Sequence, residues 1–252
     1  MRKEIIFLSL FPFFLLGCEL IYTKVNLQYG IVAYSILLAL LMLIALYITL
    51  DRNMRYFVII LILLPLTRII GSSMEIRSLA FESRISVVYT AVFLSALLLF
   101  QQFSLRLSDI GHRIAGLKFI PLAFLVGAGL GFIEYNILRP DIQIEPVNMR
   151  NVFFSLIVFI TFTGYVEELI FRGLMQSILE EFMPITITIV YCNILFLIMH
   201  IIWGSILELV FVFCVGILLG FIFHRTRNLY LVSTIHGILN FHLFVMYPLL
   251  LS

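Results

Sequence analysis

The chain has little charge for its length. Lys, Arg, Asp and Glu make up 12% of its 252 residues, whereas hydrophobic residues make up 63%. The mean hydropathy is +1.16, and only about half of the residues of a typical soluble domain are apolar. These values exclude a water-soluble fold. The net charge of +2 is small, and the basic residues fall in short segments between apolar runs, so we expect no nucleic-acid partner.

Cysteine is also scarce, and several catalytic motifs are missing. Cys18, Cys192 and Cys214 lie within or beside apolar runs without a CxxC or Cys/His ligand spacing, so we predict that they are packing residues. The sequence contains no Ser/His/Asp order, no Gly-rich phosphate loop and no His-Glu-x-x-His motif. These absences disfavour a serine protease, a nucleotide-binding protein and a zincin.

Long apolar runs are what the sequence does contain. A helix needs about 20 apolar residues to cross the hydrocarbon core, and we expect spans near residues 5–22, 30–50, 56–71, 85–103, 119–137, 152–171, 184–203, 206–223 and 229–250. The sequence therefore predicts an all-α, polytopic bundle of about 8–9 transmembrane helices. The weakest span is 56–71, which contains Pro65 and ends in Arg68. Eight helices remain an alternative if that segment is re-entrant.

Residues 1–252 are predicted to form one integral-membrane domain. N-terminal helices occupy 1–137, the loop 138–150 follows, and the helices of 150–252 carry the polar motifs. Two small-residue spacings, Gly127-x-x-x-Gly131 and Gly216-x-x-x-Gly220, predict close helix packing. If the N-terminus lies inside, fewer basic residues fall in the outer segments than in the inner ones, which is the usual arrangement. The outer ones are then Lys24, Arg68, Arg77, Arg84, Arg139 and Arg150. The N-terminus also resembles a lipoprotein signal peptide ending at Cys18, although an uncleaved first span is the simpler interpretation.

Ionisable residues within the last helices require an explanation, because each costs roughly 2.5–3.5 kcal/mol at the bilayer centre. The run Glu167-Glu168-Leu-Ile-Phe-Arg172 places three of them together. On a helix, Glu168 and Arg172 form an i,i+4 pair, whereas Glu167 points away from the arginine. We therefore predict a structural ion pair between Glu168 and Arg172 and a chemical role for Glu167.

Two further helices carry polar residues, His200 on one and His236 with Asn240 on the other. Helical rise brings Glu167 and His200 to the same depth only if the helix of Glu167 continues through Glu180 before the chain turns at Met183-Pro184. We predict that extension. Glu134, Glu208, His224 and His242 are expected to be interfacial or locally satisfied.

The ordered motifs Glu167-Glu168-x-x-x-Arg172, Phe196-x-x-x-His200 and His236-x-x-x-Asn240 resemble those of the CPBP family, which includes the Ras-converting-enzyme type of CAAX prenyl protease and bacterial Abi proteins. The resemblance implies an intramembrane glutamic endopeptidase that needs no cofactor. In it, Glu167 and His200 would activate water, His236 and Asn240 would stabilise the oxyanion, and Glu168 with Arg172 would support them. A buried carboxylate and preoriented donors suit this chemistry.

Such an enzyme would cut a membrane-associated or terminally processed protein substrate in the lipid bilayer, and a prokaryotic cytoplasmic membrane is the expected location. One chain could hold the whole site, and the oligomeric state is left open. A metal-dependent variant, a non-enzymatic scaffold or immunity protein, and a proton-coupled transporter remain alternatives, since buried Glu and His side chains suit each of them.

Overall fold

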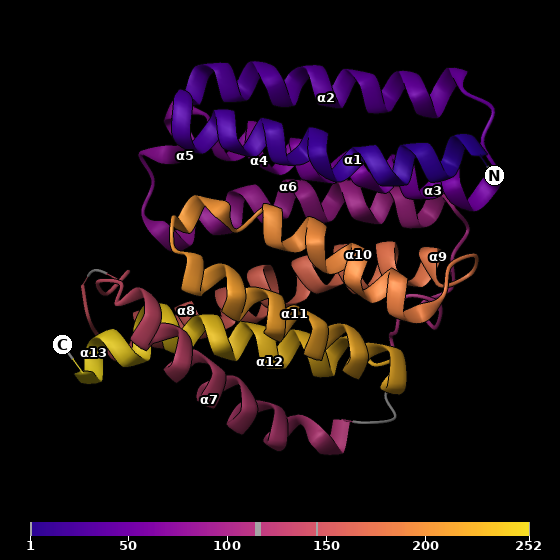
Figure 1. The fold of residues 1–252 in the computed structure, drawn as a ribbon. Coiled ribbons are helices and arrows are strands. Elements are labelled where there is room, and N and C mark those ends of the chain that lie inside the picture. Colours follow the sequence, from indigo (N-terminus) through magenta and orange to yellow (C-terminus); the bar gives the residue numbers. More distant parts are fainter. Residues whose placement is uncertain (1, 114–116, 145, 252) are drawn as a thin grey trace.

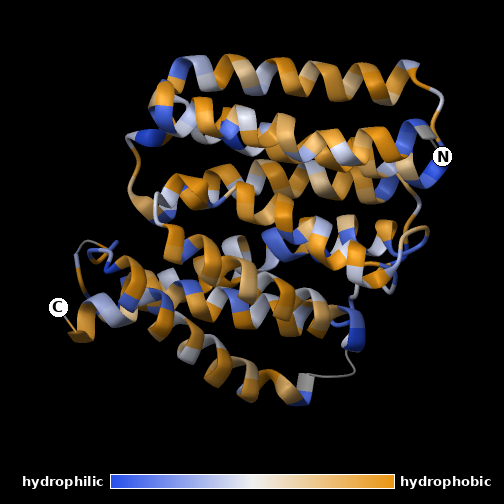
Figure 2. Ribbon diagram, viewed as in Figure 1, coloured by the Kyte–Doolittle hydropathy of each residue, from blue (hydrophilic) through white to orange (hydrophobic). Residues whose placement is uncertain are grey.

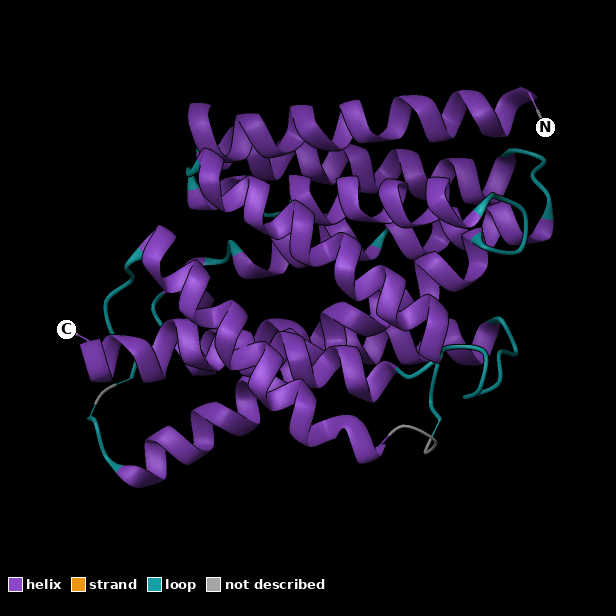
Figure 3. Ribbon diagram, turned by 60° about the horizontal axis from the view of Figure 1, so that its bottom comes forward, coloured by secondary structure: helices purple, strands orange, loops and turns teal. Residues whose placement is uncertain are grey.

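The structure, a computed structural model, describes residues 2–113, 117–144 and 146–251. Within these residues every regular element is a helix (Figure 1, Figure 3), and nine stretches are long and apolar enough to cross a bilayer. The prediction of an all-α bundle is confirmed. The N- and C-termini lie at opposite ends of the bundle (Figure 1), as an odd number of spans requires.

The nine stretches are Lys3–Val25, Leu27–Tyr47, Arg52–Gly71, Phe81–Gln102, Ile120–Leu138, Met149–Leu179, Ile185–Trp203, Ile206–Thr226 and Leu229–Leu251. The α-helices within and between them are α1 (Arg2–Leu20), α2 (Leu27–Tyr47), α3 (Arg52–Leu61), α4 (Leu63–Gly71), α5 (Met74–Arg77), α6 (Phe81–Gln102), α7 (Ile120–Leu138), α8 (Met149–Val158), α9 (Ser177–Leu179), α10 (Ile185–Ile198), α11 (Ile206–Thr226), α12 (Leu229–Phe241) and α13 (Tyr247–Leu251). Short π-helical or 3-10 segments extend or join them, namely η1 (Ile21–Val25), η2 (Leu117–Phe119), η3 (Phe159–Val166), η4 (Leu169–Gln176), η5 (Ile201–Trp203) and η6 (His242–Met246).

The third stretch, Arg52–Gly71, is long and apolar enough to cross a membrane. Its helix breaks at Ile62, between α3 and α4, and Pro65 lies in the first turn of α4. Proline is tolerated there because the first-turn amides have no partner within the helix. The alternative of eight spans is therefore not what the structure shows.

The helix of Glu167 continues far beyond Arg172, as predicted. It runs from Met149 to Leu179, with Glu180 as its C-terminal cap residue. Glu167 and Glu168 lie between the π-helical segments η3 and η4. The π-helical turns, which are frequent at functional sites, are a feature that the sequence did not indicate.

Hydrophobic residues predominate along the helices, and hydrophilic residues gather mainly at the helix ends (Figure 2). Phe13 is 71% exposed, Leu46 68% and Leu125 73%. Soluble monomers rarely expose contiguous apolar surface on this scale. The chain is therefore an integral membrane protein.

Helix α12 lies in the centre and packs closely against α7 and η3. The predicted Gly127-x-x-x-Gly131 contact is confirmed, because Gly127 faces the carbonyl of Ile235 and Gly131 that of Leu239. On the other side of α12, Gly237 lies against the backbone of Ile160 in η3. The helix with His236 and Asn240 is thus fixed by backbone contacts.

Gly237→Ala is expected to destabilise the fold, because the added Cβ would lie 2.5 Å from the Ile160 Cα atom. Overpacking of this kind costs about 1–3 kcal/mol, so the melting temperature in detergent should fall. Gly129→Ala is the matched control, since no atom lies within 4 Å of its added Cβ. An equal effect of both substitutions would contradict the packing argument.

Candidate active site

Glu168 and Arg172 form the predicted ion pair at the centre of the bundle. Arg172 Nη1 lies 3.0 Å from Glu168 Oε1, and their side chains are 3% and 0% exposed. Arg172 Nη2 also donates to the carbonyl of Gly216 on α11, at 3.1 Å, and the guanidinium lies 4.8 Å from the centroid of the Phe196 ring. Arg172 therefore contacts α11 through the Gly216 carbonyl and α10 through the Phe196 ring.

The second glycine spacing, Gly216-x-x-x-Gly220, has a polar role in addition to close packing. Gln176, one turn below Arg172, donates to the carbonyl of Gly220 at 3.0 Å. A Cβ at position 216 would overlap with Asn193 Oδ1, and one at position 220 would lie 3.2 Å from Gln176 Oε1. The glycines therefore leave room for the polar side chains of Asn193 on α10 and Gln176 on the long helix.

His236 lies between the two glutamates. Its Nδ1 is 2.8 Å from Glu168 Oε1, and its Nε2 is 3.8 Å from Glu167 Oε2. Because the carboxylate of Glu168 accepts from Nδ1, the orientation of the imidazole ring is fixed. The hydrogen-bond partner of one ring nitrogen helps to set the protonation of the other nitrogen. Here that other nitrogen, Nε2, faces Glu167.

Glu167 differs from Glu168 in its surroundings. Its side chain is 16% exposed, and it borders a cavity of about 770 Å³ that is also lined by His200 and Asn240. The hydroxyl of Tyr89 on α6 donates to Glu167 Oε1. A carboxylate that borders a cavity can meet water and substrate, whereas the buried Glu168 cannot.

His200 follows the end of α10 and borders the same cavity. Its Nδ1 donates to the carbonyl of Phe196 at 2.8 Å, so in the neutral ring Nε2 has a free lone pair. No hydrogen bond joins His200 to Glu167 among the residues that the structure describes. Both side chains line one cavity, as an arrangement at similar depth would allow.

The four residues predicted to be catalytic thus lie together. The cavity is lined by Glu167, His200 and Asn240. His236 does not line it, but its Nε2 lies 3.8 Å from Glu167 Oε2. His236 touches both glutamates, a contact that the sequence did not reveal. In the described part of the chain, no group of three or more His, Cys, Asp or Glu side chains could hold a metal ion.

Three contributors from the N-terminal half were not singled out from the sequence: Tyr89, Arg68 and Glu19. Tyr89 hydrogen-bonds Glu167, and Arg68 borders the cavity while paired with Glu19. Arg68 and Glu19 lie inside apolar runs, which is the signal that drew attention to Glu167. Tyr89 has no such signal, since tyrosine is common in membrane helices.

Glu134 and Glu208 were expected to be interfacial or locally satisfied, and the structure buries both of them. They are 5% and 0% exposed, and their carboxyl groups lie next to each other. Helices α7 and α11, which carry them, pack together. Glu134 also borders the cavity.

No curated protein and no solved structure matches the chain. Residues 149–242 match the family described as type II CAAX prenyl endopeptidase, Rce1-like. The match begins at the first residue of α8 and ends just after α12, so it contains all three motifs. The resemblance to the CPBP family is therefore confirmed, and the motif-bearing helices are similar to those of type II CAAX prenyl endopeptidases of the Rce1-like family.

Proposed function

We propose that this protein is an intramembrane glutamic endopeptidase. The observation that supports it best is the position of Glu167, which borders a large cavity beside His200 and Asn240 and is held by Tyr89. The cavity provides the room for water and a peptide segment that hydrolysis within a membrane requires. Glu168, fully buried and paired with Arg172, has a supporting role.

In this mechanism Glu167 and His200 take a proton from water as its oxygen attacks the carbonyl carbon of the substrate. Asn240 donates a hydrogen bond to the oxyanion that forms. His236, when protonated at both nitrogens, donates through Nδ1 to Glu168 and presents Nε2–H on the side of Glu167. The C–N bond then breaks, and the proton passes to the leaving amine. Preoriented donors of this kind contribute several kcal/mol to catalysis.

The cavity is also consistent with a protease rather than a transporter. Residues of the short segments that connect the spans border it at one end of the bundle, among them Arg77, Pro140 and Trp203, whereas the described loop residues at the other end do not line it. A pore open to both membrane faces would favour a transporter. We therefore favour peptide hydrolysis over proton-coupled flux, with a membrane-associated or terminally processed protein as substrate and a prokaryotic cytoplasmic membrane as location.

The proposal is tested by cleavage of membrane-anchored peptides by the purified protein in liposomes, with product termini read by mass spectrometry. His200→Ala is expected to lower kcat by about 10²–10⁴-fold, the usual contribution of a positioned acid or base. EDTA and phenanthroline should leave the wild-type rate unchanged. His224→Ala is the control and should cleave normally, because His224 lies in the last turn of α11, whereas His200 precedes the start of that helix. Loss of activity with a chelator and its return with a metal ion would replace the glutamic mechanism with a metal-dependent one.

A further inference from the structure

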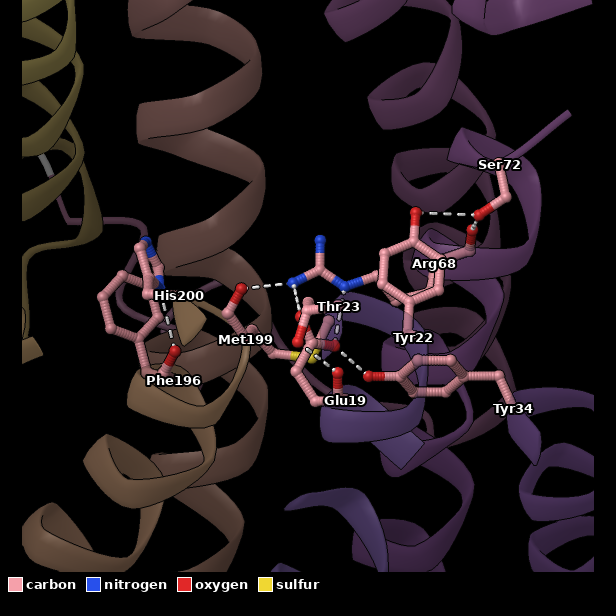
Figure 4. A network of polar contacts seen from close by, with 9 residues as sticks. All are labelled: Glu19, Tyr22, Thr23, Tyr34, Arg68, Ser72, Phe196, Met199 and His200. Atoms are coloured by element: carbon pink, nitrogen blue, oxygen red, sulfur yellow. Dashed lines mark hydrogen bonds and ion pairs between the residues drawn. The ribbon is translucent and has the colours of Figure 1, made fainter. Parts of the chain in front are cut away.

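The N-terminal half of the bundle contains a buried ion pair between α1 and α4. Arg68 Nε lies 3.0 Å from Glu19 Oε2, and Arg68 Nη2 lies 2.8 Å from Glu19 Oε1 (Figure 4). The side chain of Glu19 is 0% exposed and that of Arg68 16%. Tyr34 on α2 also donates to Glu19 Oε2. Glu19 therefore holds the planar guanidinium in one orientation.

This orientation directs Arg68 at the helix that precedes His200. Arg68 Nη2 also donates to the backbone carbonyl of Met199 (Figure 4). Met199 is the C-terminal cap residue of α10, and carbonyls at the end of a helix lack partners within the helix. A cation near this end is also favoured by the helix dipole. The contact joins the two halves of the bundle directly beside His200.

The ring of His200 is fixed relative to α10 in turn. Its Nδ1 donates to the carbonyl of Phe196, one turn back, and the Phe196 ring centroid lies 4.4 Å from that of the histidine. The end of α10 and the imidazole therefore move as one unit. The hydrogen bond from Arg68 to Met199 ties this unit to α4, in addition to the packing of α10 and η5 against α1.

We propose that Arg68, held by Glu19, is a positioning residue for His200. This inference rests on the proposed function, and it assigns part of the active site to helices outside the family-matched region. A displacement of about 1 Å at a catalytic group lowers a rate by about 10²-fold, so a defined position for His200 matters. Lysine cannot replace this arginine, because one ammonium group cannot bind both oxygens of Glu19 and also reach Met199.

Two measurements on Arg68→Lys test the proposal: steady-state kinetics, and hydrogen exchange of the peptide covering residues 196–206. The charge of the ion pair remains in this variant, so we expect folding to be retained. We expect kcat to fall about 10- to 100-fold with KM unchanged, and the amides of residues 199–204 to exchange faster. Arg227→Lys is the matched control, because Arg227 also pairs with a glutamate, Glu180, but far from the cavity. It should match the wild type in both readouts.

Wild-type exchange in Arg68→Lys would overturn the proposal, and so would faster exchange without a loss of kcat. Should the lysine variant fail to fold, Glu19→Leu combined with Arg68→Met removes both charges together, which is often tolerated in a buried pair. The same two readouts then apply. Exchange does not depend on activity, so a wild type that cleaves no peptide would count against the proposed function, while the exchange rates would still decide the role of Arg68.

Discussion

Glu167→Gln is expected to abolish peptide cleavage while leaving the fold intact. A general base contributes about 10²–10⁴-fold to a rate, and the glutamine side chain cannot accept a proton from water. Its carbonyl oxygen can still accept the hydrogen bond that Tyr89 donates. Glu167 forms no ion pair with Arg or Lys in the described part of the chain, and His236, which faces it, keeps the carboxylate of Glu168 as its partner. The measurement is kcat per folded molecule in liposomes.

Glu168→Gln is the neighbouring control and should behave differently. It removes the carboxylate that neutralises Arg172 and holds His236 Nδ1, so the main loss should be in stability and folded yield. Full activity of Glu167→Gln would contradict the assignment of the base. A stable but inactive Glu168→Gln, combined with an active Glu167→Gln, would exchange the roles of the two residues.

Arg172→Met is expected to cause the largest loss of stability among single substitutions in the site. Removing one partner of a buried ion pair costs about 3–5 kcal/mol, because the other charge remains uncompensated. Here Glu168 would keep only its contact with His236, and the carbonyl of Gly216 would lose its donor. The folded fraction after purification and the melting temperature in detergent measure this effect.

Arg227→Met provides the comparison for Arg172. Arg227 pairs with Glu180 near the end of the bundle, where their side chains are 29% and 8% exposed. Because exposure to solvent weakens an ion pair, this variant should lose less stability than Arg172→Met. Adding Glu168→Leu to Arg172→Met should restore part of the stability, since it removes the uncompensated charge. Similar losses for Arg172→Met and Arg227→Met would show that the buried pair has no special role.

The elements that depend on local sequence could be predicted. Hydropathy indicates the nine spans, and i,i+4 spacing predicts the pair of Glu168 and Arg172. The extension of the long helix to Leu179 followed from a requirement of equal depth for Glu167 and His200. Each of these inferences uses only residue spacing within one helix, or rise along the chain.

Contacts between distant helices could not be predicted in the same way. Glu19 and Arg68 are 49 residues apart, and apolar runs do not specify which helices become neighbours. The same holds for Tyr89 beside Glu167 and for the burial of Glu134 against α11. The π-helical segment that precedes Glu167 lies against α12, where Gly164 and Gly237 allow the backbones to approach, and this neighbour is likewise distant in the sequence.

The cavity reaches Arg77, Pro140 and Trp203 at one end of the bundle, and no described loop residue at the other end lines it. In the proposed endopeptidase, a peptide bond is therefore expected to reach Glu167 from one membrane face. The insertion of the chain, which basic residues in the loops direct, therefore also decides which compartment supplies the substrate. If the chain were inserted in the opposite orientation, every distance in the site would be unchanged, but the cavity would face the proteins of the other compartment.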